Sequence, residues 1–443
     1  MPEIEQDSHP HSHAHGLWVG DVDVDDAAMS VEELPEFLQH ERADVRCMAA
    51  EAVSQTAADP SSVAGLVAAP KLLEALLSAC GGADEASVHA AAALVNICAE
   101  SLAVARPRLL AAGAVKIARA GAVGSGADTT ARTAEQSAQH IEFCCMLLAN
   151  LTQGDDGRAA LADDGTPLAL DELVRLYAAD AEGGGRRHLG PALTNCLAHA
   201  AGRKALLLGN PKVKRGPPPL LTLCGLLRSP DASKRLDAAR CLRNVCFEAQ
   251  GGAAAAAADG AEAPVDALLK HAAVLVAALA AGLAVTDGGA TSPWPDAELY
   301  SSDELAGFSA ELRAALPPIP PPREPTGTAP AAMDPESEEA MKAAADEELA
   351  RRRRCREANP FVEPQPEARQ AATEALLLLS NNEEAAEAMR AAGLQPLLRQ
   401  SHFSEWHEPT AEANANLVRA AGMLQMPEEE GAGEEEPRIE EVE

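Results

Sequence analysis

Apolar side chains recur along the chain with the spacing of helices, and several segments are apolar on nearly every side. The clearest are ASVHAAAALVNICA (residues 86–99) and HIEFCCMLLANLT (residues 140–152). A helix without a polar face is stable only when neighbours cover it on both sides. Alanine and leucine favour helices, whereas aromatic residues make up only 2% of the chain. The pattern therefore predicts an all-α fold in which these segments are central helices.

Four apolar helices each contain one asparagine in their middle: Asn96 in ALVNICAE, Asn150 in MLLANLTQ, Asn195 in ALTNCLAH and Asn244 in CLRNVCFE. The four recur every 45 to 54 residues, and armadillo and HEAT units are about 40–47 residues long. Between them lie a polar break, a short helix such as GRAALADDG or GRKALLLGN, and a leucine-rich helix. Such a unit leaves apolar faces uncovered, so its neighbours must stack on it. We therefore expect an armadillo/HEAT-like right-handed α-solenoid of about six to seven helical repeats.

Composition shifts divide the chain into five regions. These are a disordered His/Asp-rich arm (1–29), the armadillo-like repeats (30–315), a proline-rich and charged insert (316–366), a C-terminal helical repeat (367–426) and a disordered acidic tail (427–443). Ser30 to Glu33 form a capping-box pattern ahead of LPEFLQ. Gly113, Gly165 and Gly393 fall at breaks between short and long helices. In the last repeat, Asn381 or Asn416 is expected to replace the central amide.

Charge and cysteine usage limit the partners and the compartment. The net charge is -32, more than half of it in the acidic ends, and the body is acidic too. This argues against nucleic acid or an anionic membrane as a partner. The ten cysteines include no CxxC pair, which is typical of reduced core residues. With no secretory signal and no bilayer-length apolar run, we expect a cytoplasmic protein. A nuclear pool is allowed by the run Arg351–Arg354, although pairing with nearby acidic residues is the plainer interpretation.

The asparagines have two interpretations. A buried amide without a partner costs about 1–3 kcal/mol, so each must form hydrogen bonds within the stack or with a ligand. In armadillo solenoids the third helix of a unit lines a groove, where an asparagine can bind the backbone of an extended peptide. Tryptophans wall such a groove, but Trp18, Trp294 and Trp406 all lie outside the asparagine helices. We therefore favour the internal hydrogen bond.

Other patterns that suggest chemistry are weak. DVDVDDAAMSVE resembles a calcium loop but has Asp26 where the turn needs glycine. The histidines between His9 and His15 lack supporting residues for a structural metal site. The terminal residues Glu440, Glu441, Val442 and Glu443 are similar to the Glu-Glu-Val-Asp end of heat-shock chaperones, and a plain solubilising tail is the alternative. No motif of a nucleotide-binding loop, serine hydrolase or zinc protease is present, so we expect no catalytic residues, metal or cofactor.

An ordered set of segments resembles the HGH family of eukaryotic armadillo-like proteins. It comprises LPEFLQHERADVRCMAAEAV, LVNICAE, CCMLLANLTQGDDGRAAL, LTNCLAHAAGRKALLL, KRLDAARCLRNVCFE, ELYSSDELAGFSAELRAALPP, PPREP, ARQAATEALLLLSNN, LQPLLRQSH and EWHEP. The segments occur in the family's order from about residue 31 to 426, a range that takes in most of the chain. The chain departs from the family in its insert from Thr326 to about Asn359 and in the alanine tract from Ala253 to Ala258.

The resemblance implies a non-enzymatic folding factor. Members look like cytosolic co-chaperones that help translation elongation factor 2 to fold, together with the cytosolic chaperonin and the ninety-kilodalton heat-shock chaperone. The alternative from the residues alone is an armadillo peptide-groove adaptor for transport or signalling.

Overall fold

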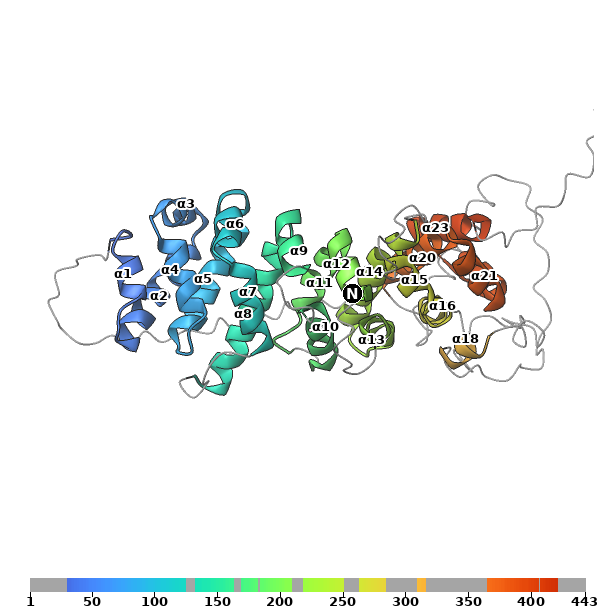
Figure 1. The fold of residues 1–443 in the computed structure, drawn as a ribbon, viewed down its shortest axis with the longest axis horizontal. Helices are drawn as coiled ribbons and strands as arrows, with labels where there is room; N and C mark the ends of the chain where they lie inside the picture. Colours follow the sequence, from blue (N-terminus) through green and yellow to red (C-terminus); the bar gives the residue numbers. More distant parts are fainter. Residues whose placement is uncertain are drawn as a thin grey trace, which may run out of the picture.

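The computed structural model describes residues 30–124, 132–162, 169–181, 184–208, 218–250, 263–283, 309–315, 365–405 and 407–420. Every regular element in this part of the chain is a helix. The helices form one elongated row that follows the sequence from α1 to α23 (Figure 1). The predicted all-α solenoid is therefore confirmed.

Most helices fall into units of three, and we call the members of each unit its first, second and third helix. After the pair α1 (Leu34–Leu38) and α2 (Ala43–Ala57), the elements are α3 (Pro60–Ala68), α4 (Leu72–Cys80), α5 (Ala86–Glu100), α6 (Leu102–Ala111), α7 (Ala114–Val123), α8 (Ala134–Leu151), α9 (Asp155–Ala162), α10 (Ala169–Ala179), α11 (Leu189–Ala198), α12 (Ala200–Leu208), α13 (Pro219–Leu226), α14 (Ala232–Cys246), the 3-10 helix η2 (Phe247–Gln250), α15 (Pro264–Leu269), α16 (Ala272–Ala281), α18 (Ala310–Ala315), α20 (Pro366–Ser380), α21 (Glu383–Ala391), α22 (Leu394–Ser404) and α23 (Glu408–Ala420).

The third helices form the backbone of the array. Helices α2, α5, α8, α11, α14, α20 and α23 pack on one another in that order. Helix α20 lies between α14 and α23 and also contacts α16. It therefore takes the third-helix position of the unit that α15 and α16 begin. Residues 316–364, which precede α20, thus interrupt a unit rather than separating two units.

The turns between first and second helices need a left-handed residue. Gly113, with φ of 81°, stands before α7, and Gly393, with φ of 74°, stands before α22. Lys71 occupies the matching position before α4 with φ of 59°. Glycine adopts this conformation without steric penalty, so the predicted breaks at Gly113 and Gly393 have a physical basis. Gly165 lies outside the described residues.

A repeated Gly-Arg pair explains how a first helix joins the preceding third helix. A Cβ on Gly157 would lie 1.9 Å from the Leu151 carbonyl oxygen, and one on Gly202 would lie 2.2 Å from that of Cys196. Only glycine permits this approach of the two helices. The arginine that follows caps the carbonyls at the end of the third helix: Arg158 Nε donates to Thr152 O at 3.1 Å, and Arg203 Nη1 donates to Ala198 O at 2.9 Å. The sequences GRAAL and GRKAL therefore mark the joint between consecutive units.

A buried polar network holds the last unit against α20. Arg369 of α20 donates two hydrogen bonds of 2.8 Å to the Glu405 carboxylate, and their side chains are 1% and 0% exposed. Nearby, Thr373 donates to Asn414 Oδ1 at 3.1 Å, and Asn414 Nδ2 donates to Ser401 at 3.3 Å. The buried amide of the last unit is thus Asn414.

The residues expected to supply that amide, Asn381 and Asn416, contact their own helices instead. Asn381 follows the end of α20 and donates to the carbonyl of Leu377 at 3.3 Å. Asn416 accepts a hydrogen bond of 3.0 Å from Arg419. Asn414 lies two residues before Asn416 on α23, and at that position its side chain faces α20 and α22. The sequence expectation for the last repeat is therefore corrected to Asn414.

Within the described residues, no single helix is both long and apolar enough to cross a membrane. The bent pair α3 and α4 passes the test together by length and composition alone.

We predict that Glu405→Gln lowers the free energy of unfolding by about 3–5 kcal/mol, because it leaves the Arg369 charge buried without its carboxylate. Urea unfolding followed by circular dichroism measures the change. The matched control is Glu383→Gln, which breaks the ion pair of Glu383 with Arg390, where the Glu383 side chain is 88% exposed. We expect the control to unfold like the wild type. Equal effects of the two substitutions would contradict the role given to the buried pair.

Candidate functional sites

The four asparagines lie on consecutive third helices. Asn96 belongs to α5, Asn150 to α8, Asn195 to α11 and Asn244 to α14. Asn244 is 4% exposed, and the other three are partly buried. Because these helices pack in this order, the sequence repeat places the amides in a line along the stack.

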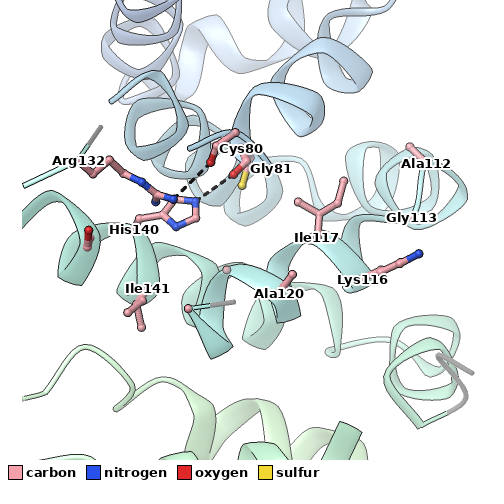
Figure 2. Close-up of a pocket in the computed structure, with 14 residues that line it drawn as sticks. Cys80, Gly81, Ala112, Gly113, Lys116, Ile117, Ala120, Arg132, His140 and Ile141 are labelled. Atoms are coloured by element: carbon pink, nitrogen blue, oxygen red, sulfur yellow. Dashed lines mark hydrogen bonds between the residues drawn. The ribbon is translucent and has the colours of Figure 1, made fainter. Parts of the chain in front are cut away.

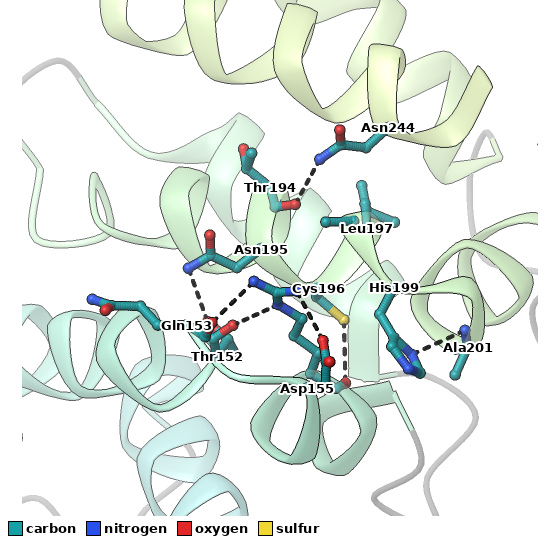
Figure 3. Close-up of polar contacts among 12 residues, drawn as sticks. Thr152, Gln153, Asp155, Thr194, Asn195, Cys196, Leu197, His199, Ala201 and Asn244 are labelled. Carbon is teal, nitrogen blue, oxygen red and sulfur yellow. Dashed lines mark hydrogen bonds and ion pairs between the residues drawn. The ribbon is translucent and has the colours of Figure 1, made fainter. Parts of the chain in front are cut away.

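Three of the amides bind the preceding third helix in the same register. Asn150 Nδ2 donates to Val95 O at 3.4 Å. Asn195 Nδ2 donates to Ala149 O at 3.2 Å, and Asn244 Nδ2 donates to Thr194 O at 2.9 Å. Each acceptor belongs to the residue just before the preceding asparagine (Figure 3 shows the last step, from Asn244 to Thr194). We call this series the asparagine ladder.

The ladder bonds are accepted by the second lone pair of carbonyl oxygens within the helices. A carbonyl oxygen has two lone pairs, so it can accept the amide N–H in addition to its own helical hydrogen bond. The ladder thereby fixes how each third helix is shifted along its neighbour. Asn96 precedes the first step, and its side chain makes no hydrogen bond to the described part of the chain.

These bonds affect the peptide-groove hypothesis. An asparagine grips a peptide backbone with one N–H donor and its oxygen acceptor. Each ladder bond uses one of the two N–H donors of Asn150, Asn195 and Asn244, and Asn195 Nδ2 also donates to Thr152 Oγ1 at 3.4 Å. A ligand role for the four asparagines stays a prediction. The three tryptophans and the terminal residues Glu440 to Glu443 lie outside the described residues, as does the run Arg351–Arg354.

Sequence reasoning missed a cluster of two thiols and one imidazole between the unit α3–α5 and the unit α6–α8. Cys80 ends α4, whereas His140 and Cys144 lie one turn apart on α8. The ligating atoms of the three side chains all lie within 4.8 Å of one another. Cys80 is 1% exposed, Cys144 0% and His140 5%. The two cysteines are far apart in the sequence and form no CxxC pair, so only the i, i+4 spacing of His140 and Cys144 could have indicated them.

The cluster adjoins a cavity of about 520 Å³. Cys80 and His140 line it together with residues of α7, among them Lys116 and Ile117, and with Arg132 (Figure 2). His140 Nε2 lies 3.0 Å from the Cys80 carbonyl oxygen and 3.6 Å from Cys144 Sγ. The first contact joins the two units, because the imidazole of α8 donates to the backbone carbonyl at the end of α4.

The two thiols are electrostatically unequal. A hydrogen bond from Cys144 lowers the pKa of the Cys80 thiol, with smaller contributions from His140 and Arg132, and this outweighs the opposing effect of burial. The same contact with Cys80, together with burial, raises the pKa of Cys144. By contrast, burial raises the pKa of the neighbouring Cys145 to about 12. The cluster thus has the donor types of a soft-metal or redox site.

A buried tyrosine and aspartate form a second titratable pair outside the ladder. Tyr177 OH donates to Asp237 Oδ2 at 2.8 Å, and a Cβ on Gly190 would lie 1.9 Å from that oxygen. Burial raises the pKa of the Asp237 carboxyl, while the Tyr177 hydrogen bond lowers it by less. The pair is packed against Gly190 with no room for a substrate, so we interpret it as a link between α10 and α14.

The fold and the ladder define an α-solenoid of armadillo-like units. A family model described as a domain of unknown function (DUF383) matches residues 132–269, which span α8 to α15. The comparison with curated proteins gives no match.

Similar solved structures are crystal structures of engineered proteins. One is 21% identical, covers 56% of this chain and 87% of that chain, and has a TM-score of 0.42. Another is 22% identical, covers 49% and 81%, and has a TM-score of 0.39. A third is 17% identical, covers 88% and 98%, and has a TM-score of 0.35. The assignment of fold rests on the helices of the chain itself.

We predict that Asn244→Ala lowers the free energy of unfolding by about 1–2 kcal/mol, because the buried step of the ladder to Thr194 is lost. Asn96→Ala is the matched control, since it removes the same side chain from a third helix without breaking a ladder bond. Its effect should stay within about 0.5 kcal/mol. Urea unfolding of both variants measures the difference, and equal losses would contradict the ladder.

The Asp237 carboxyl gives a prediction for pH. Its folded-state pKa lies above the unfolded value of about 3.9. Its ionisation therefore removes stability as the pH rises from the unfolded-state pKa through the folded-state pKa. Asp237→Asn cannot ionise, so its melting temperature relative to the wild type should increase as the pH rises above about 4. Tyr177→Phe removes the hydrogen bond that lowers the pKa of Asp237. This variant should therefore lose more stability than the wild type as the pH rises. Melting curves across this pH range test both, and a difference independent of pH would refute the assignment.

Proposed function

We propose that the chain is a non-enzymatic co-chaperone that holds translation elongation factor 2 while it folds. The observation that carries the proposal is the DUF383 match over residues 132–269. DUF383 is the domain of the HGH family, to which the ordered segments of the sequence are similar. The match falls on the central units, where three of those segments supply the ladder residues Asn150, Asn195 and Asn244.

The surface of the solenoid is compatible with holding a partly folded client. Among the described residues, the large exposed apolar side chains are Met48 on α2 (63% exposed), Val104 on α6 (57%), Phe247 on η2 (42%) and Val274 on α16 (43%). They belong to four different elements of the solenoid. Scattered apolar contacts over a long surface suit a client that presents several short apolar segments, whereas a tight site concentrates its binding energy in one pocket.

The peptide-groove adaptor receives less support. Its grip would need the amides of Asn150, Asn195 and Asn244 to face a ligand, whereas one N–H of each is bonded to the preceding third helix. The proposal therefore assigns the asparagines to the scaffold and the client contact to the exposed apolar side chains. The acidic tail with Glu440 to Glu443 is proposed to bind a repeat domain of the kind that clamps the Glu-Glu-Val-Asp end of heat-shock chaperones, and the cytoplasm is the proposed compartment.

We predict that the chain, immobilised and exposed to eukaryotic cytosol, enriches elongation factor 2 and the cytosolic chaperonin. Mass spectrometry of the captured proteins measures this. Removing Glu440 to Glu443 should reduce, in the captured set, the repeat-domain proteins that clamp the end of heat-shock chaperones, while elongation factor 2 is retained. Absence of both the elongation factor and every chaperone from the captured set would refute the proposed function.

The contact surface is tested with purified proteins. A variant with Met48, Val104, Phe247 and Val274 changed to serine should bind unfolded elongation factor 2 at least tenfold more weakly, as measured by its ability to suppress aggregation of the diluted client. Because these side chains are exposed, we expect its melting temperature to stay close to that of the wild type. The matched variant Asn150→Ala/Asn195→Ala/Asn244→Ala should be less stable yet bind the client normally below its melting temperature. The reverse pattern would favour the groove.

A further inference from the structure

The cluster of Cys80, His140 and Cys144 has no role in the proposed co-chaperone activity. It combines two thiols with one imidazole, and these are ligands that zinc prefers in tetrahedral sites. We propose that these three side chains bind one zinc ion, which joins the unit α3–α5 of the solenoid to the unit α6–α8.

The arrangement on the helices suits a metal. His140 and Cys144 are four residues apart on α8, so they project from the same face one turn apart. Cys80 approaches from the C-terminal end of α4 in the preceding unit. A pair of ligands on one helix and a third from a neighbouring helix end form a common way of building such sites, because each element fixes its ligand independently.

The distances agree with a tetrahedral centre. With Zn–S of about 2.3 Å and Zn–N of about 2.0–2.1 Å, a nitrogen and a sulfur ligand should be separated by roughly 3.5 Å and two sulfur ligands by roughly 3.8 Å. His140 Nε2 and Cys144 Sγ are 3.6 Å apart, and no pair of ligating atoms in the cluster is separated by more than 4.8 Å. Metal binding would replace the hydrogen bond from His140 Nε2 to the Cys80 carbonyl oxygen and release the proton of that nitrogen. Small side-chain rotations would then bring the third ligand to its position.

The surroundings leave a place for entry and for a fourth ligand. The cavity of about 520 Å³ reaches Cys80 and His140, so an ion and a water molecule can approach the cluster from that side. Arg132, which lines the cavity, donates to the carbonyl oxygens of Ala83 at 3.1 Å and Gly82 at 3.4 Å. Two thiolates would balance the charge of Zn²⁺, which makes burial of the ion feasible.

Gly121 of α7 is part of this packing. A Cβ at this position would lie 2.3 Å from Cys144 Sγ and 3.1 Å from His140 Cε1. A side chain here would displace the sulfur, so glycine permits the thiol and the imidazole to approach each other. Another group with suitable donors, Cys47, Glu85 and His89, is less buried, and its Glu85 is exposed. The buried cluster is therefore the stronger candidate.

Cobalt provides a direct test, because it replaces zinc in such sites and gives visible absorption when thiolates bind it. The full chain, reduced and freed of metal with a chelator, is titrated with Co²⁺ and then with Zn²⁺. We expect one equivalent of Co²⁺ to produce the thiolate absorption and Zn²⁺ to abolish it. Zinc should also raise the melting temperature, since it binds the folded state alone. Absence of thiolate absorption in the reduced wild type would overturn the proposal.

The variants separate this site from other metal binding. Cys80→Ser and Cys144→Ser should each weaken cobalt binding at least 100-fold, while Cys145→Ser, which changes an equally buried thiol on α8, should bind like the wild type. Gly121→Ala keeps all three ligands and should weaken binding at least tenfold. Replacing His9, His11, His13 and His15 with alanine should leave the thiolate absorption unchanged. Loss of absorption in the Cys145 or the histidine variant, or its retention in the Cys80 and Cys144 variants, would contradict the site.

Discussion

The structure depends on one constraint: no three-helix unit of this chain can bury its own apolar faces. The third helices α5 and α8 are apolar on nearly every side and each lies between two other third helices. The cost of exposing such a helix makes stacking obligatory and forces the elongated shape. Everything that distinguishes one stacking geometry from another must then come from a few polar contacts, because alanine-rich faces fit together in many registers.

The asparagine ladder, the Gly-Arg joints and the buried Arg369–Glu405 pair supply that selection. The ladder joins α5, α8, α11 and α14, the joints connect α9 and α12 to the third helices before them, and the ion pair closes the last unit. Each device satisfies groups that burial would otherwise leave without partners. These contacts fix how neighbouring helices are oriented, and they do not involve the exposed side chains that we assign to the proposed client.

The sequence predicted the helical class, the repeat and the line of asparagines, because these follow from periodicity within short windows. It also predicted the left-handed breaks at Gly113 and Gly393, which depend on local backbone conformation alone. The thiol–imidazole cluster could not be found in this way, since Cys80 and His140 meet only when two units stack. The same holds for Asn414, which was missed in favour of Asn416: the choice depends on which face of α23 meets α20, and nearby polar residues obscure that face in the sequence.

The central claim is that the ladder is scaffold and that clients bind elsewhere on the solenoid. Hydrogen–deuterium exchange of the chain, alone and with unfolded elongation factor 2, tests it most directly. The account predicts that the client slows backbone exchange around Met48, Val104, Phe247 and Val274 and leaves the ladder segments of α8, α11 and α14 unchanged. Slower exchange confined to the ladder segments, with none at the exposed apolar side chains, would contradict it.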